Sequence, residues 1–155
     1  MIREDKEIPD KKMIYEIIEQ NHICRLAFAN GDEPYIVPVN YGYKDEKIYV
    51  HSALSGRKLE MLKANSRICF EISDSVEIVT SDVACGYTTK YRSAIGYGTA
   101  KLLTATEDKI ISLNIIMKQH TGKSDWDFSS ASLSKMLIIE ITIDSVTGKN
   151  SGYKI

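Results

Sequence analysis

The sequence predicts a mainly β fold, an antiparallel barrel with helices at its periphery. Six or seven short runs are rich in β-branched and aromatic residues, most of them are linked by hairpin-like turns, and only three segments show helical apolar spacing. Strands and helices do not alternate regularly, as a doubly wound α/β sheet would require. With 155 residues, 43% of them hydrophobic, the chain can bury one full core, so we expect a single domain over residues 1–155.

Local signals predict the first helix and the first strand. Asp10 is a good N-cap residue, and apolar residues recur at helical spacing down to about Asn21. These apolar positions are Met13, Ile14, Ile17 and Ile18. Residues 22–29 alternate as a strand does, and residues 30–32 (Asn-Gly-Asp) have the chemistry of a turn. We therefore expect a helix that packs on the barrel, followed by a strand that turns into the centre of the chain.

The central stretch predicts a hairpin that leads into a second helix. Residues 34–41 and 48–53 have the composition of strands, and the polar residues 44–47 have that of the turn between them. Ser55 is the expected N-cap of a helix whose apolar spacing stops near Asn65.

Two cations, Arg57 and Lys58, fall in the first turn of this second helix. A helix start has unpaired backbone N–H groups and a partial positive charge, so added cations make it an anion site, and phosphate is the commonest biological anion. The alternative is an exposed helix start that carries basic residues by chance. Because cations oppose the helix dipole at this end, their pairing favours the phosphate interpretation slightly.

Further strands are expected at residues 67–72, 91–103 and 136–143, with an edge strand at 76–80 inside a polar connection. Residues 147–149 (Thr-Gly-Lys) are expected to form a turn before a polar tail. Two glycines within the 91–103 strand predict a bulge, a bend or the close approach of another group. They are Gly96 and Gly98.

A third helix is expected at residues 107–120, with Thr106 as its cap and Gly122 as its stop signal. Its apolar side is formed by Ile110, Leu113, Ile116 and Met117. Residues 123–134 are expected to form a surface loop or lid, and Trp126 within it either covers a ligand or anchors the loop to the surface.

Composition excludes several classes of function. The 20 basic and 21 acidic side chains provide no overall field for nucleic acid. The three cysteines are widely spaced, so neither a disulfide framework nor a zinc site is indicated, and no His/Glu metal spacing occurs. No Walker or GxGxxG motif is present. The chain has no long apolar span and begins with charged residues, so we expect a soluble cytoplasmic protein that binds neither membrane nor nucleic acid.

Two further polar residues stand out. His51 lies near the end of a strand that leads to Arg57 and Lys58, so it could line the pocket of a bound phosphate compound, or it could be a structural hydrogen-bonding group. Arg25 lies among apolar residues of a strand, and is expected to be either an edge residue facing water or a group held by a partner or an anionic ligand.

Five segments of the chain carry a family resemblance. They are Arg25-Leu26-Ala27, residues 34–43 (PYIVPVNYGY), residues 48–53 (IYVHSA), Gly56-Arg57-Lys58 and Tyr91-Arg92-Ser93. In this order and spacing they resemble the pyridoxamine 5′-phosphate oxidase-related FMN-binding proteins, and most of all their nitroimidazole-resistance (Nim-like) branch. The resemblance runs from Ile2 to Lys149, and the combination of the HSA and GRK sequences is its most specific part.

The resemblance implies a split β-barrel that forms a homodimer, with FMN in the cleft between the subunits. It implies that one strand lies against the isoalloxazine ring, through Val37, Pro38, Val39, Asn40 and Tyr41. His51 and Ser52 are implied to border the flavin, and Arg57 and Lys58 to hold its phosphate. Arg92 and Ser93 are implied to reach the same phosphate or ribityl region from a neighbouring strand.

The resemblance also implies an FMN-dependent oxidoreductase that reduces nitroaromatic or quinone-like compounds, with a small molecule as its substrate. His51 is the candidate catalytic residue, for proton transfer or substrate orientation beside the ring. Two alternatives stay open: a flavin-binding sensor or storage protein without turnover, and a split-barrel protein that binds a deazaflavin or haem. A true pyridoxamine-phosphate oxidase is longer, and no second phosphate motif is present here, so that particular reaction is not expected.

Overall fold

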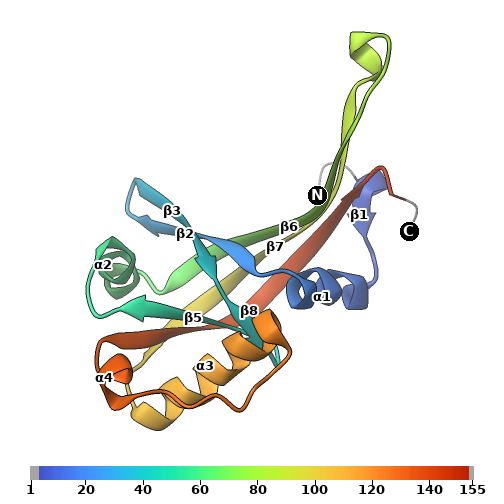
Figure 1. The fold of residues 1–155 in the computed structure, drawn as a ribbon. Helices are drawn as coiled ribbons and strands as arrows, with labels where there is room; N and C mark the ends of the chain where they lie inside the picture. The colour runs from blue at the N-terminus through green and yellow to red at the C-terminus, as the bar shows by residue number, and fades with distance from the viewer. Residues whose placement is uncertain (1–3, 154–155) are drawn as a thin grey trace.

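An eight-stranded antiparallel sheet dominates the structure, a computed structural model that describes residues 4–153 (Figure 1). The strands are β1 (Glu7–Ile8), β2 (Ile23–Asn30), β3 (Glu33–Asn40), β4 (Gly42–Lys44), β5 (Lys47–Ala53), β6 (Arg67–Val79), β7 (Thr88–Leu103) and β8 (Met136–Ser151). The helices are α1 (Lys11–Gln20), α2 (Arg57–Ala64), α3 (Thr106–Thr121) and α4 (Ser130–Leu133), and short 3-10 turns lie at η1 (Glu4–Lys6) and η2 (Ala84–Gly86).

The sheet is a barrel that is split along one side. Its strand order is β3-β2-β6-β7-β8-β5-β4, with β1 paired to β8, and every neighbouring pair is antiparallel. Strands β3 and β5 come close to each other without forming a ladder, so the barrel is open between them. Helices α1, α2 and α3 lie at the periphery (Figure 1). The predicted antiparallel barrel with peripheral helices is confirmed.

Helix α1 forms as predicted and closes one end of the barrel. Asp10 is its N-cap, because its side chain accepts a hydrogen bond from the amide of Lys12 at 2.9 Å. Ile14, Ile17 and Ile18 are buried against β6, β7 and β8. Burial of three isoleucine side chains contributes about 1.5–3 kcal/mol each. Within residues 4–153, no helix combines the length and apolar composition that crossing a membrane requires.

The predicted hairpin between residues 34–41 and 48–53 is wrong. Strand β3 pairs along its length with β2, and it is β4 that turns into β5. The chain changes course at Tyr41, which is fully buried and whose hydroxyl donates a hydrogen bond to the carbonyl of Ile18. Gly42 follows, where an added Cβ would lie 2.6 Å from the backbone of α3. Packing of α3 against this point therefore separates β3 from a short additional strand, β4, which local periodicity does not reveal.

Strands β6, β7 and β8 are longer than predicted. The predicted edge strand at residues 76–80 is the continuation of β6, which runs to Val79 and pairs with β7. The expected turn at residues 147–149 is wrong, since these residues lie inside β8. A Cβ at Gly148 would lie 2.6 Å from the side chain of Ile14, so the glycine lets α1 approach the sheet and does not mark a turn.

The two glycines of β7 allow close packing, as predicted. A Cβ at Gly96 would lie 2.2 Å from the ring of Phe70, and one at Gly98 would lie 2.6 Å from the carbonyl oxygen of Thr142. The pairing of β7 with β8 shifts register between Tyr97 and Gly98. The bulge and the close approach therefore occur together at this point.

Helix α3 covers β4, β5 and β8 beside the split (Figure 1). Gly122 ends it in the left-handed conformation with φ of 78°, as predicted. Thr106 is the first residue of the helix and Ala105 holds the cap position, so the predicted cap is one residue off. Leu113 and Ile116 are buried, but Ile110 faces solvent. The predicted apolar side is therefore confirmed only over its C-terminal half.

Candidate functional site

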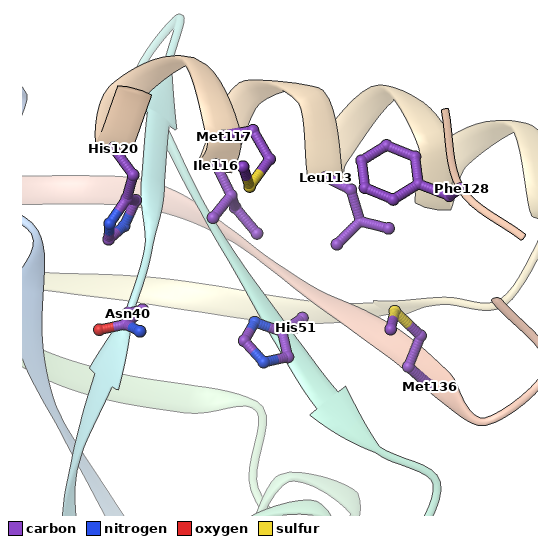
Figure 2. Close-up of a pocket in the computed structure, with 8 residues that line it drawn as sticks. All are labelled: Asn40, His51, Leu113, Ile116, Met117, His120, Phe128 and Met136. Atoms are coloured by element: carbon purple, nitrogen blue, oxygen red, sulfur yellow. The ribbon is translucent and has the colours of Figure 1, made fainter. Parts of the chain in front are cut away.

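The split between β3 and β5 opens into a pocket beneath α3. Its volume is about 310 Å³, and its walls come from β3, β5, α3, the segment before α4, and the start of β8. The lining residues are Asn40, His51, Leu113, Ile116, Met117, His120, Phe128 and Met136. Figure 2 shows the side chains of Asn40, His51 and His120 on one side of this space and the apolar residues around the rest. Such a pocket suits a flat apolar group that carries a few polar atoms.

Strand alternation decides which residues of β5 reach the pocket. His51 is exposed and lines the pocket, whereas Ser52 points to the opposite face of the strand and is buried in the barrel. The expectation that both side chains border a ligand is therefore not met: the Ser52 side chain belongs to the interior. This outcome follows from the two-residue period of a strand, in which neighbouring side chains face opposite ways.

Residues 37–41 were all predicted to contact the flavin ring. Their side chains also alternate between the two faces of the strand. Val37 and Val39 are half-buried and pack against the barrel core. Tyr41 is fully buried, so its side chain is not at the pocket surface. Pro38 and Asn40 face outward and are exposed, and of the five only Asn40 lines the pocket. Only the outward face and the edge of this strand are therefore accessible from the pocket.

All three histidines of the chain gather near the pocket. The ring centroid of His120 lies 4.8 Å from that of His22. The Nε2 atom of His120 lies 3.1 Å from the carbonyl oxygen of Tyr41, which can only accept a hydrogen bond, so Nε2 carries the proton. Partial desolvation of its ring in the pocket wall lowers the pKa of His51, and repulsion from Lys58 and His120 lowers it further. The imidazole of His51 is therefore neutral at neutral pH.

Gln119 fixes the end of α3 next to His120. Its side-chain amide donates to the carbonyl oxygens of Ile18 at 3.1 Å and Asn21 at 2.6 Å, and its oxygen accepts from the amide of Tyr43 at 2.6 Å. One side chain thus joins α1, α3 and β4. His120 is held in the pocket wall by a rigid connection to the barrel.

Helix α2 begins at the end of β5 with a different cap from the predicted one. Gly56 holds the N-cap position with φ of 127°, a conformation that other residues rarely adopt, and it makes no side-chain cap. Its carbonyl accepts from the amides of Leu59 at 2.9 Å and Glu60 at 3.2 Å. The amides of Arg57 and Lys58 precede the first intrahelical bonds and point away from the helix start. The cap without a side chain leaves this end accessible to an anion.

Arg57 bends back from α2 onto β3. Its guanidinium forms an ion pair with Glu33 and lies 4.9 Å from the ring centroid of Tyr35. Both members of the ion pair are more than half exposed, so the pair is worth little, about 0.2–1 kcal/mol. An incoming phosphate would compete with the Glu33 carboxylate for this guanidinium.

Lys58 differs from Arg57 in lacking a counter-ion. Its side chain is half-buried, desolvation lowers its pKa, and within residues 4–153 no carboxylate forms an ion pair with it. It is also close enough to His51 to influence the pKa of that imidazole. A desolvated cation is costly unless an anion accompanies it, so this position favours a bound anion next to the pocket.

Arg92 and Ser93 are not part of this site within one chain. They pair with Asn150 and Lys149 near the C-terminal end of β8, whereas the end of β5 that leads to α2 pairs with the beginning of β8. The guanidinium of Arg92 is held by Asp74 through two hydrogen bonds of 2.9 and 2.8 Å. The prediction that both residues reach the phosphate from a neighbouring strand is therefore wrong for a single chain.

The site can hold an elongated ligand. A cation and free amides at the start of α2 suit a phosphate, and the apolar pocket beside His51 suits a flat ring system. The few residues from His51 to Arg57 span at most about 20 Å, because a strand rises about 3.3 Å per residue. A single molecule with a phosphate at one end and a ring at the other can occupy both parts.

Comparison with known proteins identifies the family. The family model described as pyridoxamine 5′-phosphate oxidase matches residues 10–150, most of the chain. The chain belongs to the pyridoxamine 5′-phosphate oxidase family. The family resemblance of the sequence motifs is thus confirmed.

Several solved structures of similar fold share this architecture. A crystal structure from Bacteroides thetaiotaomicron, provisionally described as a 5-nitroimidazole antibiotic resistance protein, is 31% identical over 93% of this chain and 86% of its own, with a TM-score of 0.82. An FAD- and haem-binding protein from Mycobacterium smegmatis is 16% identical over 96% of this chain and 74% of its own, with a TM-score of 0.83. In a comparison of sequences alone, a protein of Rhizobium meliloti without assigned function is 28% identical over 58 residues, so the match spans only 37% of this chain and 38% of that protein.

This member of the oxidase family has site residues that its sequence motifs do not reveal. His120 and the apolar residues of α3 reach the pocket from a helix far along the chain, and only their helical spacing marked that helix as amphipathic. Phe128, from the loop expected to act as a lid, forms part of the wall. Trp126 in the same loop is not one of the lining residues, and its indole N–H donates to the carbonyl of Lys123 at 3.0 Å.

Proposed function

We propose that this protein binds FMN and acts as a flavin-dependent oxidoreductase on small electron-accepting aromatic compounds. The observation that carries the proposal is Lys58, a half-buried cation with no carboxylate partner in the described part of the chain, at a helix start that adjoins an apolar pocket. A flavin mononucleotide has the matching parts, a phosphate joined by a chain to a flat ring system. Membership of the family supports the same cofactor.

Different residues of the chain would hold the phosphate, flank the ring and exclude water. Lys58, the free amides at the start of α2 and Arg57, once released from Glu33, hold the phosphate. The outward faces and free edges of β3 and β5 flank the ring, with Asn40 and His51 beside it. Leu113, Ile116, Met117 and Phe128 exclude water from the pocket. The bound flavin supplies the electron transfer.

His51 would orient the substrate through hydrogen bonds or take up a proton there. Its imidazole is neutral at neutral pH, because burial and Lys58 disfavour its charged form. A neutral imidazole can donate one hydrogen bond and accept another, so it can orient a nitro or carbonyl oxygen beside the ring. The substrate class is supported by the 31% identical protein described as a 5-nitroimidazole antibiotic resistance protein, and quinone-like compounds share the same electron-accepting chemistry.

The proposed assembly is a homodimer with the flavin in the cleft between the subunits. The outward face of β3 beside the pocket is exposed in one chain, at Ile36, Pro38 and Asn40. A second copy would cover this face and close the site from outside. Sedimentation of the flavin-loaded protein tests this assembly, and a monomer that holds one flavin per chain would contradict it.

Haem is the second candidate ligand. The pocket contains two histidines and two methionines, side chains that commonly ligate haem iron, and a protein of the same fold binds FAD and haem. The absorption spectrum of the purified protein separates a flavin, a deazaflavin and a haem. Steady-state reduction of a nitroaromatic compound with NADH or NADPH then separates an oxidoreductase from a flavin-binding sensor. A flavin spectrum with turnover supports the proposal, whereas a haem spectrum or no bound chromophore after FMN addition contradicts it.

A further inference from the structure

A long hairpin projects from the barrel. Beyond Asp74 of β6 and Tyr91 of β7, the two strands pair only with each other among the described residues 4–153, through Glu77 with Lys90, Ile78 with Thr89 and Val79 with Thr88. We call residues 75–90 the arm. Figure 1 shows the arm extending away from the body of the protein, with η2 at its tip. An isolated two-stranded hairpin is at best marginally stable in water, so an arm of this kind needs a packing partner.

The base of the arm is held firmly. The guanidinium of Arg92 forms a bidentate ion pair with the carboxylate of Asp74 across the strands, through hydrogen bonds of 2.9 and 2.8 Å. The hydroxyl of Tyr153 donates to the carbonyl of Ser75 at 2.6 Å, and the ammonium of Lys90 lies 5.6 Å from the Tyr153 ring centroid. The direction in which the arm leaves the barrel is therefore fixed by the body of the protein.

The apolar side chains of the arm continue an apolar face of the barrel. Ile78 pairs with Thr89, which lies on the same face of β7 as Ile95 and Tyr97 by strand alternation. Val76 precedes Ile78 by two residues and lies within the register shift between Asp74 and Glu77. Val76 is 67% and Ile78 70% exposed, and Ile95 and Tyr97 are exposed as well. Ile36 of β3 lies on this face too, because its partner Ala27 on β2 pairs with Cys69, which pairs with Tyr97.

The charges on this face favour a second copy of the same chain as its partner. Two cations of this face are paired with carboxylates on the same face: Arg25 pairs with Glu71 at 2.9 Å, and Arg67 pairs with Asp144 at 2.8 Å. These residues present both signs of charge, and not the strongly basic surface that suits a nucleic acid or an anionic lipid. Two copies related by a two-fold axis would meet apolar side against apolar side, and both signs of charge would be available at the contact.

We propose that the apolar side of the arm, at Val76 and Ile78, packs against a second copy of this chain. The arm thereby extends the dimer contact beyond the barrel, and this inference rests on the dimer proposed above. In such a contact the exposed apolar side chains of the arm pack against an apolar surface of the second copy. It also explains the fixed base, since an arm held in one direction loses less conformational freedom when a partner binds.

Two single variants and one control test the arm. Val76→Asp and Ile78→Asp each place a charge on its apolar side, and Ile111→Asp places the same charge on α3, at a residue that is 54% exposed. Sedimentation equilibrium over a range of concentrations gives the dimer dissociation constant, and circular dichroism confirms folding. We expect each arm variant to raise that constant by roughly tenfold or more. We expect Ile111→Asp to behave as wild type.

Three results would overturn the proposal: a wild-type monomer at every concentration, wild-type dimer affinity in both arm variants, or equal weakening by Ile111→Asp. FMN titration of the same samples keeps the two proposals distinguishable. A dimer that depends on the arm but binds no FMN would overturn the proposed function and leave the arm contact standing. An FMN-bound dimer indifferent to both arm variants would overturn the arm contact alone.

Discussion

The ammonium group of Lys58 and the imidazole of His51 interact across the end of β5. Burial is the main cause of the lowered pKa of His51, and the charge of Lys58 adds to it. The same ammonium is half-desolvated and has no carboxylate partner among residues 4–153. The proposed phosphate site and the proposed ring pocket are thus electrostatically linked, and a bound phosphate would relieve part of the effect on His51.

The lowered pKa of His51 predicts how stability depends on pH. The unfolded chain binds a proton at His51 near pH 6.5, whereas the folded chain does so only at lower pH. Stability from this residue is therefore fully present above about pH 6.5 and is lost as the pH falls through the folded pKa. We expect urea unfolding of His51→Gln to show a weaker loss of stability below about pH 6.5 than wild type. Identical pH dependence in the two proteins would contradict the assignment.

His51 is predicted to serve turnover more than binding. His51→Ala should keep bound FMN, because the phosphate contacts lie on α2, and should slow nitroaromatic reduction by about 10²-fold if the imidazole transfers a proton. The wild-type rate should fall at acid pH with an apparent pKa below 6.5, since the neutral imidazole is the working form. Flavin occupancy, melting temperature and rate are measured on the same sample. Full occupancy with an unchanged rate would remove His51 from the mechanism.

Glu33 is predicted to compete with the phosphate for Arg57. Glu33→Gln removes the exposed ion pair and releases the guanidinium, so FMN should bind about two- to fivefold more tightly. Lys123 and Asp125 form another exposed ion pair, and Asp125→Asn is the matched control. Fluorescence titration with FMN gives both constants. Weaker binding in Glu33→Gln would mean that Glu33 positions Arg57 for the ligand.

Gly56 is predicted to be needed for the shape of the anion site. Its φ of 127° is strained for any other residue, so Gly56→Ala should destabilise the protein by about 1–3 kcal/mol or reshape the start of α2, and should weaken FMN binding. Gly31, with φ of 60° in the turn between β2 and β3, provides the control. Gly31→Ala should cost stability without changing the FMN dissociation constant. Equal FMN affinity in both variants would contradict the role of Gly56.

The sequence predicts the local elements of this protein well and its long-range pairings poorly. Asp10 and the isoleucine spacing fix α1 because capping and amphipathicity act within a few residues. The strand pairing of residues 34–44 depends instead on Tyr41, which packs under α1, and on Gly42, which packs under α3. These contacts join segments far apart in the chain, so the strand composition alone predicts the wrong hairpin. Gly148 is misleading for the same reason, as its role is to admit Ile14.

In the candidate site, too, local motifs are predicted well and long-range contacts are not. Lys58 and His51 follow from motifs that lie within one strand and the helix after it, and the structure places them within electrostatic reach of each other. His120 and Phe128 reach the pocket only because α3 and the following loop fold over β5. Ser52 shows that a motif names neighbouring residues without saying which face of the strand each one occupies.

The most direct test of the central claim is a comparison of FMN with riboflavin, which has the same ring and lacks the phosphate. Fluorescence titration of the flavin-free protein should give a dissociation constant for FMN about 10- to 150-fold below that for riboflavin, because one charge-assisted phosphate contact contributes about 1.5–3 kcal/mol. Lys58→Ala should remove most of that difference. Lys63→Ala, which changes an exposed lysine in the last turn of the same helix, should leave it intact. Equal affinity of the wild-type protein for FMN and riboflavin, or no binding of either, would contradict the phosphate site at the start of α2.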